Sequence, residues 1–252
     1  MTRITAENLS VFYPVMNAHH KTLADMEKLE KRAGWGSIVA GRRPHVVAID
    51  NISLTLKAGE RVAILGTNGS GKTTLLRTFG GIITPTQGRL RVEGDASGIF
   101  NLRQGLKMES SGRRNIILRG LALGKRLSEI RDRQEEIEIF SELGEYLDLP
   151  MSTYSSGMIM RLVFSVVIAF DPDIMLLDEW IGTADEAFRQ RAIKRLQNFV
   201  LGDRIFMLAS HSPRLLKETC ETGLLMKSGK IIEHGPLNSV LKAYKVLNSS
   251  AS

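Results

Sequence analysis

The chain has 252 residues with 34 Lys and Arg against 27 Asp and Glu, so its formal net charge is +7. This length allows one large α/β domain and requires no second one. A single cysteine, Cys220, excludes an internal disulfide, and the N-terminus lacks the apolar segment of a signal peptide. The longest apolar run, 162–170, is too short to span a membrane, so we expect a soluble chain. The positive charge suits nucleic acid, nucleotides or an anionic membrane surface, without choosing among them.

The first elements are two segments of alternating apolar residues, 3–12 and 46–57, which predict strands of an antiparallel sheet. Tyr13 follows the first of them. Its ring is suited to stacking on an adenine, but an ordinary core tyrosine at a strand end explains it equally well.

An insertion separates these strands, at about 14–46. It contains a predicted helix, 21–32, and it carries six basic and three acidic residues. A solvated helix is the simpler interpretation, and a basic amphipathic element near lipid head groups is the alternative.

The sequence VAILGTNGSGKTTLL follows, at 62–76, as a buried strand, a glycine-rich turn and the start of an apolar helix. Its spacing is G-x-x-x-x-G-K-[ST], a phosphate-binding loop, in which glycines let backbone N–H groups face a polyphosphate. Lys72 would reach the β- and γ-phosphates, and the Thr73 hydroxyl would hold Mg²⁺.

The next segment, after a turn at 84–88, contains two short predicted strands, 89–92 and 98–102. Between 103 and 133 there are nine basic residues and three acidic ones, whereas 135–148 holds six acidic residues and no basic one. Apolar residues recur there with helical spacing, which predicts a helical subdomain with a polarised surface.

A strongly apolar helix is predicted at 159–170, with Ser155 or Ser156 as its N-cap. An apolar strand, 174–177, follows and ends in Asp178 and Glu179. Beside a phosphate loop, an acid in the first position can hold Mg²⁺, and a second acid can orient or deprotonate a water molecule.

The last elements are a helix at 186–200, a buried strand at 205–209, a hairpin around Gly229 and a short C-terminal helix. His211 follows the buried strand at the edge that holds the phosphate loop. This position favours a catalytic role over that of an ordinary core or surface histidine.

Taken in this order, the phosphate loop, the capped YSSGM helix, the Asp-Glu strand and the His strand resemble the nucleotide-binding subunit of an ABC transporter. The signature of that superfamily is usually LSGGQ. The variant YSSGM, with SELGEYLDLPMSTYSSGM before it and DEWIGTADEAF after it, resembles the branch that exports capsular polysaccharide, O-antigen or teichoic acid.

The resemblance implies an α/β fold with a P-loop NTPase core, an N-terminal antiparallel β subdomain and a helical subdomain that carries the signature. The chain would be a single nucleotide-binding domain, with the β subdomain and core at about 1–102 and 171–240 and the helical subdomain at about 103–170.

The resemblance also implies roles for individual residues. Asp178 would hold the metal, Glu179 would be the catalytic base, and His211 would contact the γ-phosphate with Lys72. Tyr13 would stack on adenine, and Asp185 would be the acid of the loop after Glu179. The remaining nucleotide-binding residues would be those of the phosphate loop, Gly66, Thr67, Asn68, Gly69, Ser70, Gly71, Lys72, Thr73 and Thr74, and those of the signature, Ser155, Ser156 and Gly157.

One position departs from the family pattern. A glutamine often lies in the loop that joins core and helical subdomain, but the best-aligned residue here is Lys107, with Gln104 three residues earlier. The residue that senses the γ-phosphate in this loop therefore stays unassigned.

The implied function is ATP hydrolysis that powers export of a cell-surface polysaccharide or glycolipid across the bacterial inner membrane. The partners would be a second copy of the chain, arranged head to tail, and a membrane-spanning permease at the cytoplasmic face, with no nucleic acid. Alternatives are an ABC ATPase for a lipid, drug or ion, a non-transport ABC protein acting on ribosomes or DNA, and a nucleotide switch without turnover. Glu179 argues against the last of these.

Overall fold

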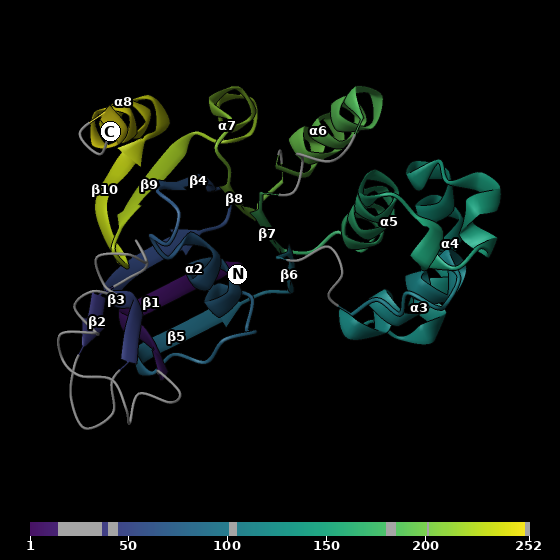
Figure 1. Ribbon diagram of the computed structural model, residues 1–252, viewed down its shortest axis with the longest axis horizontal. Helices are drawn as coiled ribbons and strands as arrows, with labels where there is room; N and C mark the ends of the chain where they lie inside the picture. Colours follow the sequence, from purple (N-terminus) through teal and green to yellow (C-terminus); the bar gives the residue numbers. More distant parts are fainter. Residues whose placement is uncertain (15–36, 40–44, 101–104, 180–184, 201, 250–252) are drawn as a thin grey trace.

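A computed structural model describes residues 1–14, 37–39, 45–100, 105–179, 185–200 and 202–249 (Figure 1). The predicted helix at 21–32 and Gln104 lie outside these residues. None of the helices in the described ranges is both long and apolar enough to span a membrane.

The N-terminal sheet is antiparallel, in the order β2-β3-β1-β5. Its strands are β1 (Arg3–Pro14), β2 (Ser37–Val39), β3 (His45–Lys57) and β5 (Gln87–Glu93). Ile4, Ala6, Ile52, Leu54 and Leu56 are buried while their neighbours along the strands are more exposed, as expected for a sheet with one solvated face. The predicted strands 3–12 and 46–57 are confirmed.

The second sheet has the order β10-β9-β4-β8-β7-β6, and all its pairings are parallel except that of β10 with β9. The strands are β4 (Arg61–Gly66), β6 (Ala96–Ile99), β7 (Ile174–Asp178), β8 (Ile205–Ala209), β9 (Thr222–Lys227) and β10 (Lys230–Pro236). The central strands are continuous apolar runs because both of their faces are covered. Ile64 and Asp178 both pair with Ala209, so β4, β7 and β8 end at one edge.

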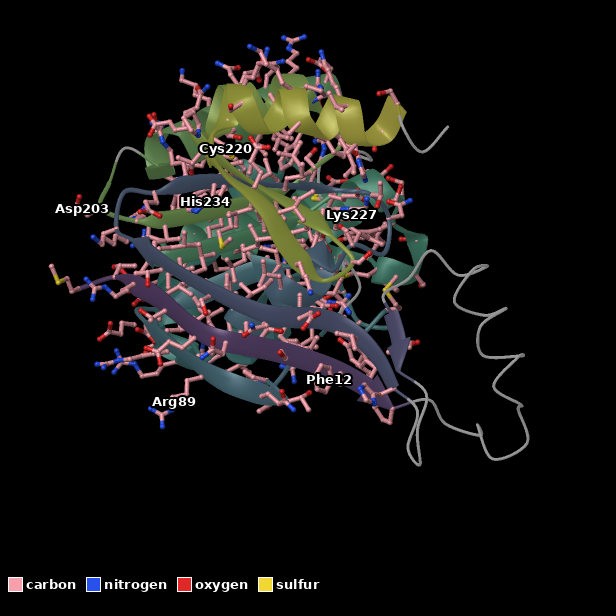
Figure 2. The ribbon with its side chains drawn as sticks, turned by 90° about the vertical axis from the view of Figure 1, so that its left-hand side faces the viewer. Phe12, Arg89, Asp203, Cys220, Lys227 and His234 are labelled. Carbon is pink, nitrogen blue, oxygen red and sulfur yellow. The ribbon has the colours of Figure 1, made fainter. Side chains whose placement is uncertain are left out.

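Helices cover both faces of the second sheet. On one face, α2 (Lys72–Phe79) packs between the two sheets through Leu75, Leu76 and Phe79. On the other lie α6 (Glu186–Val200), α7 (Pro213–Thr219) and α8 (Leu237–Ser249). Figure 2 shows the two sheets as separate layers, with Cys220 on the side of the second sheet that α8 covers.

The remaining helices form a group at one end of the molecule, away from the antiparallel sheet (Figure 1). They are α3 (Gly112–Ala122), α4 (Leu127–Ser141) and α5 (Ser156–Ala169), with short 3₁₀ turns at Gly144–Asp148 and Met151–Thr153. Some of the predicted opposite charges neutralise one another here, since Arg113 pairs with Asp148 at 2.8 Å and also with Glu138. Phe140, Phe164 and Phe188 join this group to α6.

Candidate nucleotide-binding site

The phosphate loop connects β4 to α2, and two of its glycines leave no room for a side chain. Gly71 has φ +107°, and a Cβ there would lie 2.6 Å from the Ala48 carbonyl oxygen. At Gly66 a Cβ would lie 2.4 Å from the Met226 carbonyl oxygen. The loop can therefore pack closely against both sheets only because these two positions are glycines. The helix α2 begins directly after the loop.

Lys72 is buried at the start of α2, with its ammonium group inside the loop. Its Nζ donates hydrogen bonds to the carbonyl oxygens of Gly66, at 2.8 Å, and Thr67, at 3.1 Å. Burial lowers the pKa of Lys72, while the charges of Glu179 and Asp178 oppose that shift. The cation is thus held at the loop by backbone acceptors and faced by two carboxylates.

Asp178 ends β7 beside the same loop. Burial raises the pKa of this carboxyl, and a hydrogen bond with the Thr73 side chain opposes the shift. The hydroxyl and carboxylate oxygens that meet here are the ligands Mg²⁺ prefers. The described residues contain no group of three or more His, Cys, Asp or Glu that could hold a metal ion.

A hollow of about 610 Å³ opens over these groups. Its lining includes Tyr13 and most of the phosphate loop. Gly66, Thr67 and Ser70 belong to the same loop but not to the lining, and Ser70 is buried. The lining residues are Tyr13, Val46, Ala48, Asn68, Gly69, Gly71, Lys72, Thr73, Thr74, Arg77, Asp178 and Glu179.

Tyr13 lies at the end of β1, opposite Val46 of β3. The residue is 41% exposed and lines the hollow, so it is not an ordinary core tyrosine. An aromatic ring at the border of a hollow is suited to stacking on a planar ligand.

Glu179 and His211 meet at the edge where β7 and β8 end. Glu179 has a left-handed backbone, φ 48°, and its N–H donates to the Ala209 carbonyl oxygen at 2.9 Å. The Nε2 atom of His211 lies 2.8 Å from Glu179 Oε1. The structure thus brings together the two residues that the sequence predicted from separate strands.

The signature segment forms the N-terminus of α5. Ser155 caps the helix, since its hydroxyl accepts a hydrogen bond from the Met158 N–H at 3.2 Å, as predicted. Ser155, Ser156 and Gly157 line a second hollow of about 510 Å³, together with Asp185. The two hollows share no lining residue, so the signature does not face the phosphate loop of its own chain.

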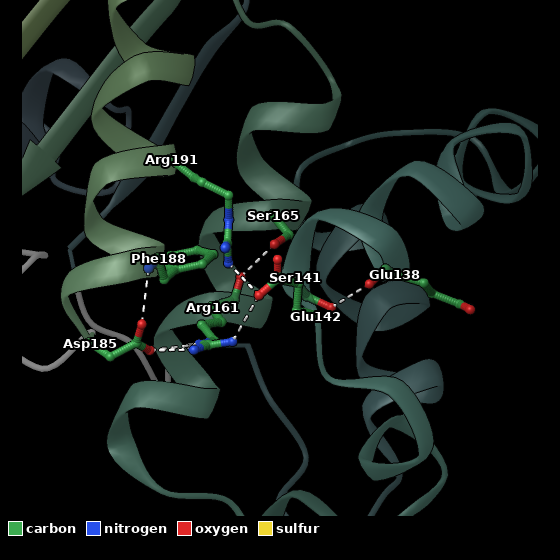
Figure 3. Close-up of polar contacts among 8 residues, drawn as sticks. All are labelled: Glu138, Ser141, Glu142, Arg161, Ser165, Asp185, Phe188 and Arg191. Carbon is green, nitrogen blue, oxygen red and sulfur yellow. Dashed lines mark hydrogen bonds and ion pairs between the residues drawn. The ribbon is translucent and has the colours of Figure 1, made fainter.

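Asp185 connects two helices (Figure 3). Its Oδ1 accepts the Phe188 N–H at 2.9 Å, which caps α6, and its Oδ2 accepts a bond from Arg161 Nε at 3.1 Å. Arg161 also lies 3.6 Å from Glu142, which in turn pairs with Arg191 at 2.5 Å. Arg161 was not predicted, although a single charged residue in the apolar run 159–170 indicates that its guanidinium has a polar partner.

Lys107 has a fixed backbone. Asn115 accepts a bond from its N–H at 2.8 Å and donates one to its carbonyl oxygen at 2.9 Å. These bonds anchor the start of the helical group, and they give Lys107 no contact with the phosphate loop. The departure from the family's glutamine stays unexplained.

The comparisons with known proteins agree with this architecture. The family model described as "ABC transporter" matches residues 49–182. The O-antigen export system ATP-binding protein RfbE of Yersinia enterocolitica is 40% identical, over 92% of this chain and 98% of that protein. RfbB of Klebsiella pneumoniae, of the same description, is 34% identical over 96% and 97%.

Among solved structures, the ATP-binding cassette MJ0796, in a dimer bound to ADP and Pi, has a TM-score of 0.72 and 19% identity, over 93% of this chain and 98% of that one. This likeness confirms the expected α/β fold with its P-loop core. The family match and the relatives of nearly equal length agree on one assignment: the chain belongs to the ABC transporter family, as an ATP-binding cassette that hydrolyses ATP.

Proposed function

We propose that the chain is the ATPase subunit of an exporter of cell-surface polysaccharide. The observation that carries the catalytic part is the convergence of Lys72, Thr73, Asp178, Glu179 and His211 on one sheet edge beside a phosphate loop. In-line attack on a γ-phosphate needs a cation, a base and a metal site within one hollow, and these residues supply them.

Each residue has a proposed task. Lys72 leaves the loop carbonyls and contacts the β- and γ-phosphates, and Glu179 orients or deprotonates the attacking water. His211 donates from Nε2 to the γ-phosphate. Thr73 and Asp178 would hold Mg²⁺, which neutralises phosphate charge when bound. Tyr13 stacks on the adenine.

A second copy of the chain completes the site. The signature, Ser155 to Gly157, has hydroxyl and backbone donors at a helix N-terminus and lines a hollow apart from the phosphate loop. A head-to-tail dimer would place this hollow over the γ-phosphate held by the partner, so that ATP joins the two copies and hydrolysis releases them. Asp185, in the same hollow, would lie at that dimer contact.

The cargo is proposed from the relatives. Proteins named for O-antigen export are 34–40% identical, and a protein of Staphylococcus epidermidis named for teichoic acids export is 36% identical over 79% of this chain. We therefore propose a polysaccharide or glycolipid cargo and a separate membrane-spanning permease. The chain would bind that permease at the cytoplasmic face of the bacterial inner membrane, with the basic insertion at 14–46 near the substrate entrance.

Co-purification tests this function. The tagged chain is expressed in its native host and isolated in mild detergent, with Glu179→Gln as a matched variant that retains ATP. We expect a membrane permease in the complex and loss of surface polysaccharide in the variant strain. Recovery of ribosomes or DNA would instead support a non-transport ABC protein, and normal surface polysaccharide would exclude this cargo.

A further inference from the structure

His211 has two partners, and only one of them belongs to the site described above. Its Nε2 faces Glu179 Oε1 at 2.8 Å, while its Nδ1 lies 3.1 Å from the hydroxyl of Tyr244 on α8. The ring is thereby held between the end of β7 and the C-terminal helix. Nothing in the sequence pattern singled out Tyr244.

The proton arrangement of these contacts follows from their chemistry. An ionised carboxylate only accepts hydrogen bonds, so Nε2 of His211 must carry the hydrogen that faces Glu179. In the neutral ring Nδ1 is then the acceptor, and the Tyr244 hydroxyl is the donor. Tyr244 therefore stabilises the tautomer that has its hydrogen on Nε2.

The hydroxyl is held in place by packing. The Tyr244 side chain is half-buried and contacts the main hydrophobic core, as do Ala243 and Leu247 of the same helix. Leu237, Val240 and Leu241 anchor α8 further, and all three are buried. The position of the hydroxyl relative to β8 is thus set by the core and does not depend on the exposed His211 itself.

We propose that Tyr244 is a positioning residue for ATP hydrolysis, which fixes His211 as an Nε2–H donor toward the γ-phosphate. The proposal rests on the role given to His211 above. The oxygens of a phosphate are acceptors, so a ring with its hydrogen on Nδ1 would present a lone pair to them and lose the contact. The C-terminal helix becomes part of the active site by this one bond.

The test uses Tyr244→Phe, which removes the hydroxyl and keeps the ring in the core. Lys245→Ala is the matched control, because this neighbour on α8 is exposed. We expect a kcat about 3- to 10-fold lower in Tyr244→Phe, the size of one neutral hydrogen bond, with KM for ATP within about twofold of the wild type. The control should match the wild type, and both should melt at the wild-type temperature.

A second measurement reads the tautomer directly. In ¹⁵N NMR of the histidine side chains, assigned with His211→Gln, the wild type should show His211 protonated on Nε2, and Tyr244→Phe should gain the Nδ1–H form. An unchanged tautomer, or an unchanged kcat despite a changed tautomer, would overturn the proposal. Wild-type turnover in His211→Gln would instead refute the role of His211, and the NMR result would still decide whether Tyr244 sets its tautomer.

Discussion

Substitutions at Asp185 can separate its contact with α6 from its contact with α5. Oδ1 of Asp185 caps α6 through the Phe188 N–H, and Oδ2 pairs with Arg161 of α5 (Figure 3). Asp185→Asn keeps an oxygen for the cap but removes the charge. Asp185→Ala removes the cap and the ion pair together. Comparing the two variants therefore separates the contribution of the helix cap to the free energy of unfolding from that of the ion pair.

The magnitudes follow from exposure. The side chain of Asp185 is 48% exposed and that of Arg161 20%, so water screens the pair and its contribution is about 0.5–1 kcal/mol. An N-cap contributes about 1 kcal/mol, and asparagine caps as well as aspartate. We expect Asp185→Asn to lower the free energy of unfolding by about 0.5–1 kcal/mol and Asp185→Ala by about 1.5–2 kcal/mol.

Urea unfolding at neutral pH measures these differences. A double-mutant cycle with Arg161→Met isolates the ion pair, because Asp185→Asn should cost little once Arg161 is gone. The surface pair Arg126 and Glu129, with side chains 80% and 43% exposed, provides a comparison. Glu129→Gln keeps an oxygen for the Arg126 N–H, so it should change the unfolding midpoint little. Equal destabilisation by Asp185→Asn and Asp185→Ala would refute the cap.

The pH dependence has a definite sign. The Phe188 N–H, and then Arg161, lower the pKa of Asp185 in the folded protein. Such a carboxylate contributes stability above the unfolded pKa of about 3.9, and this is lost as the pH falls through the folded pKa. The difference between wild type and Asp185→Asn should therefore be constant from about pH 5 to 8 and shrink below about pH 4. A difference that stays constant at low pH would contradict the ion pair.

Three further predictions concern the nucleotide hollow. Glu179→Gln should bind ATP, form a long-lived dimer on gel filtration and release phosphate roughly 10²- to 10⁴-fold more slowly, whereas normal turnover would remove Glu179 from the role of base. Asp178→Asn should melt slightly higher without nucleotide, because a half-buried carboxylate is gone, but should lose the added thermal stability that Mg²⁺ gives with ATP. Tyr13→Ala should weaken ATP binding by roughly 2- to 13-fold in a fluorescence titration, while Tyr13→Phe should bind ATP as the wild type does. Equal ATP affinities of Tyr13→Ala and the wild type would mean that the ring is not stacked on the adenine.

Much of the fold could be predicted because its signals are local. The helix at 186–200 and the strand at 205–209 have the bounds that the sequence indicated. The helix α5 begins at Ser156, directly after its Ser155 cap and three residues before the predicted start at 159. These signals are the lengths of apolar runs, the helix caps and the glycines of the phosphate loop. Each depends only on residues close together in the chain, so a single sequence is enough to recognise it.

The contacts between distant elements were not predictable in the same way. Glu179 and His211 were expected at one edge because parallel strands end together, and that rule needs no side-chain detail. Tyr244 lies on an amphipathic helix whose periodicity shows which residues face the core, but not which hydroxyl reaches a histidine 33 residues away. Only the packed core decides that.

Arg161 and Tyr244 were not predicted, and each contacts a residue that was. Arg161 joins the signature helix to Asp185, which follows the Asp-Glu strand, and Tyr244 joins the C-terminal helix to His211. Both contact a residue that the motifs identified, and neither belongs to a motif itself. The motifs identify the proposed reacting groups, whereas the contacts that Arg161 and Tyr244 make with Asp185 and His211 depend on how the helices pack and can be seen only in the folded chain.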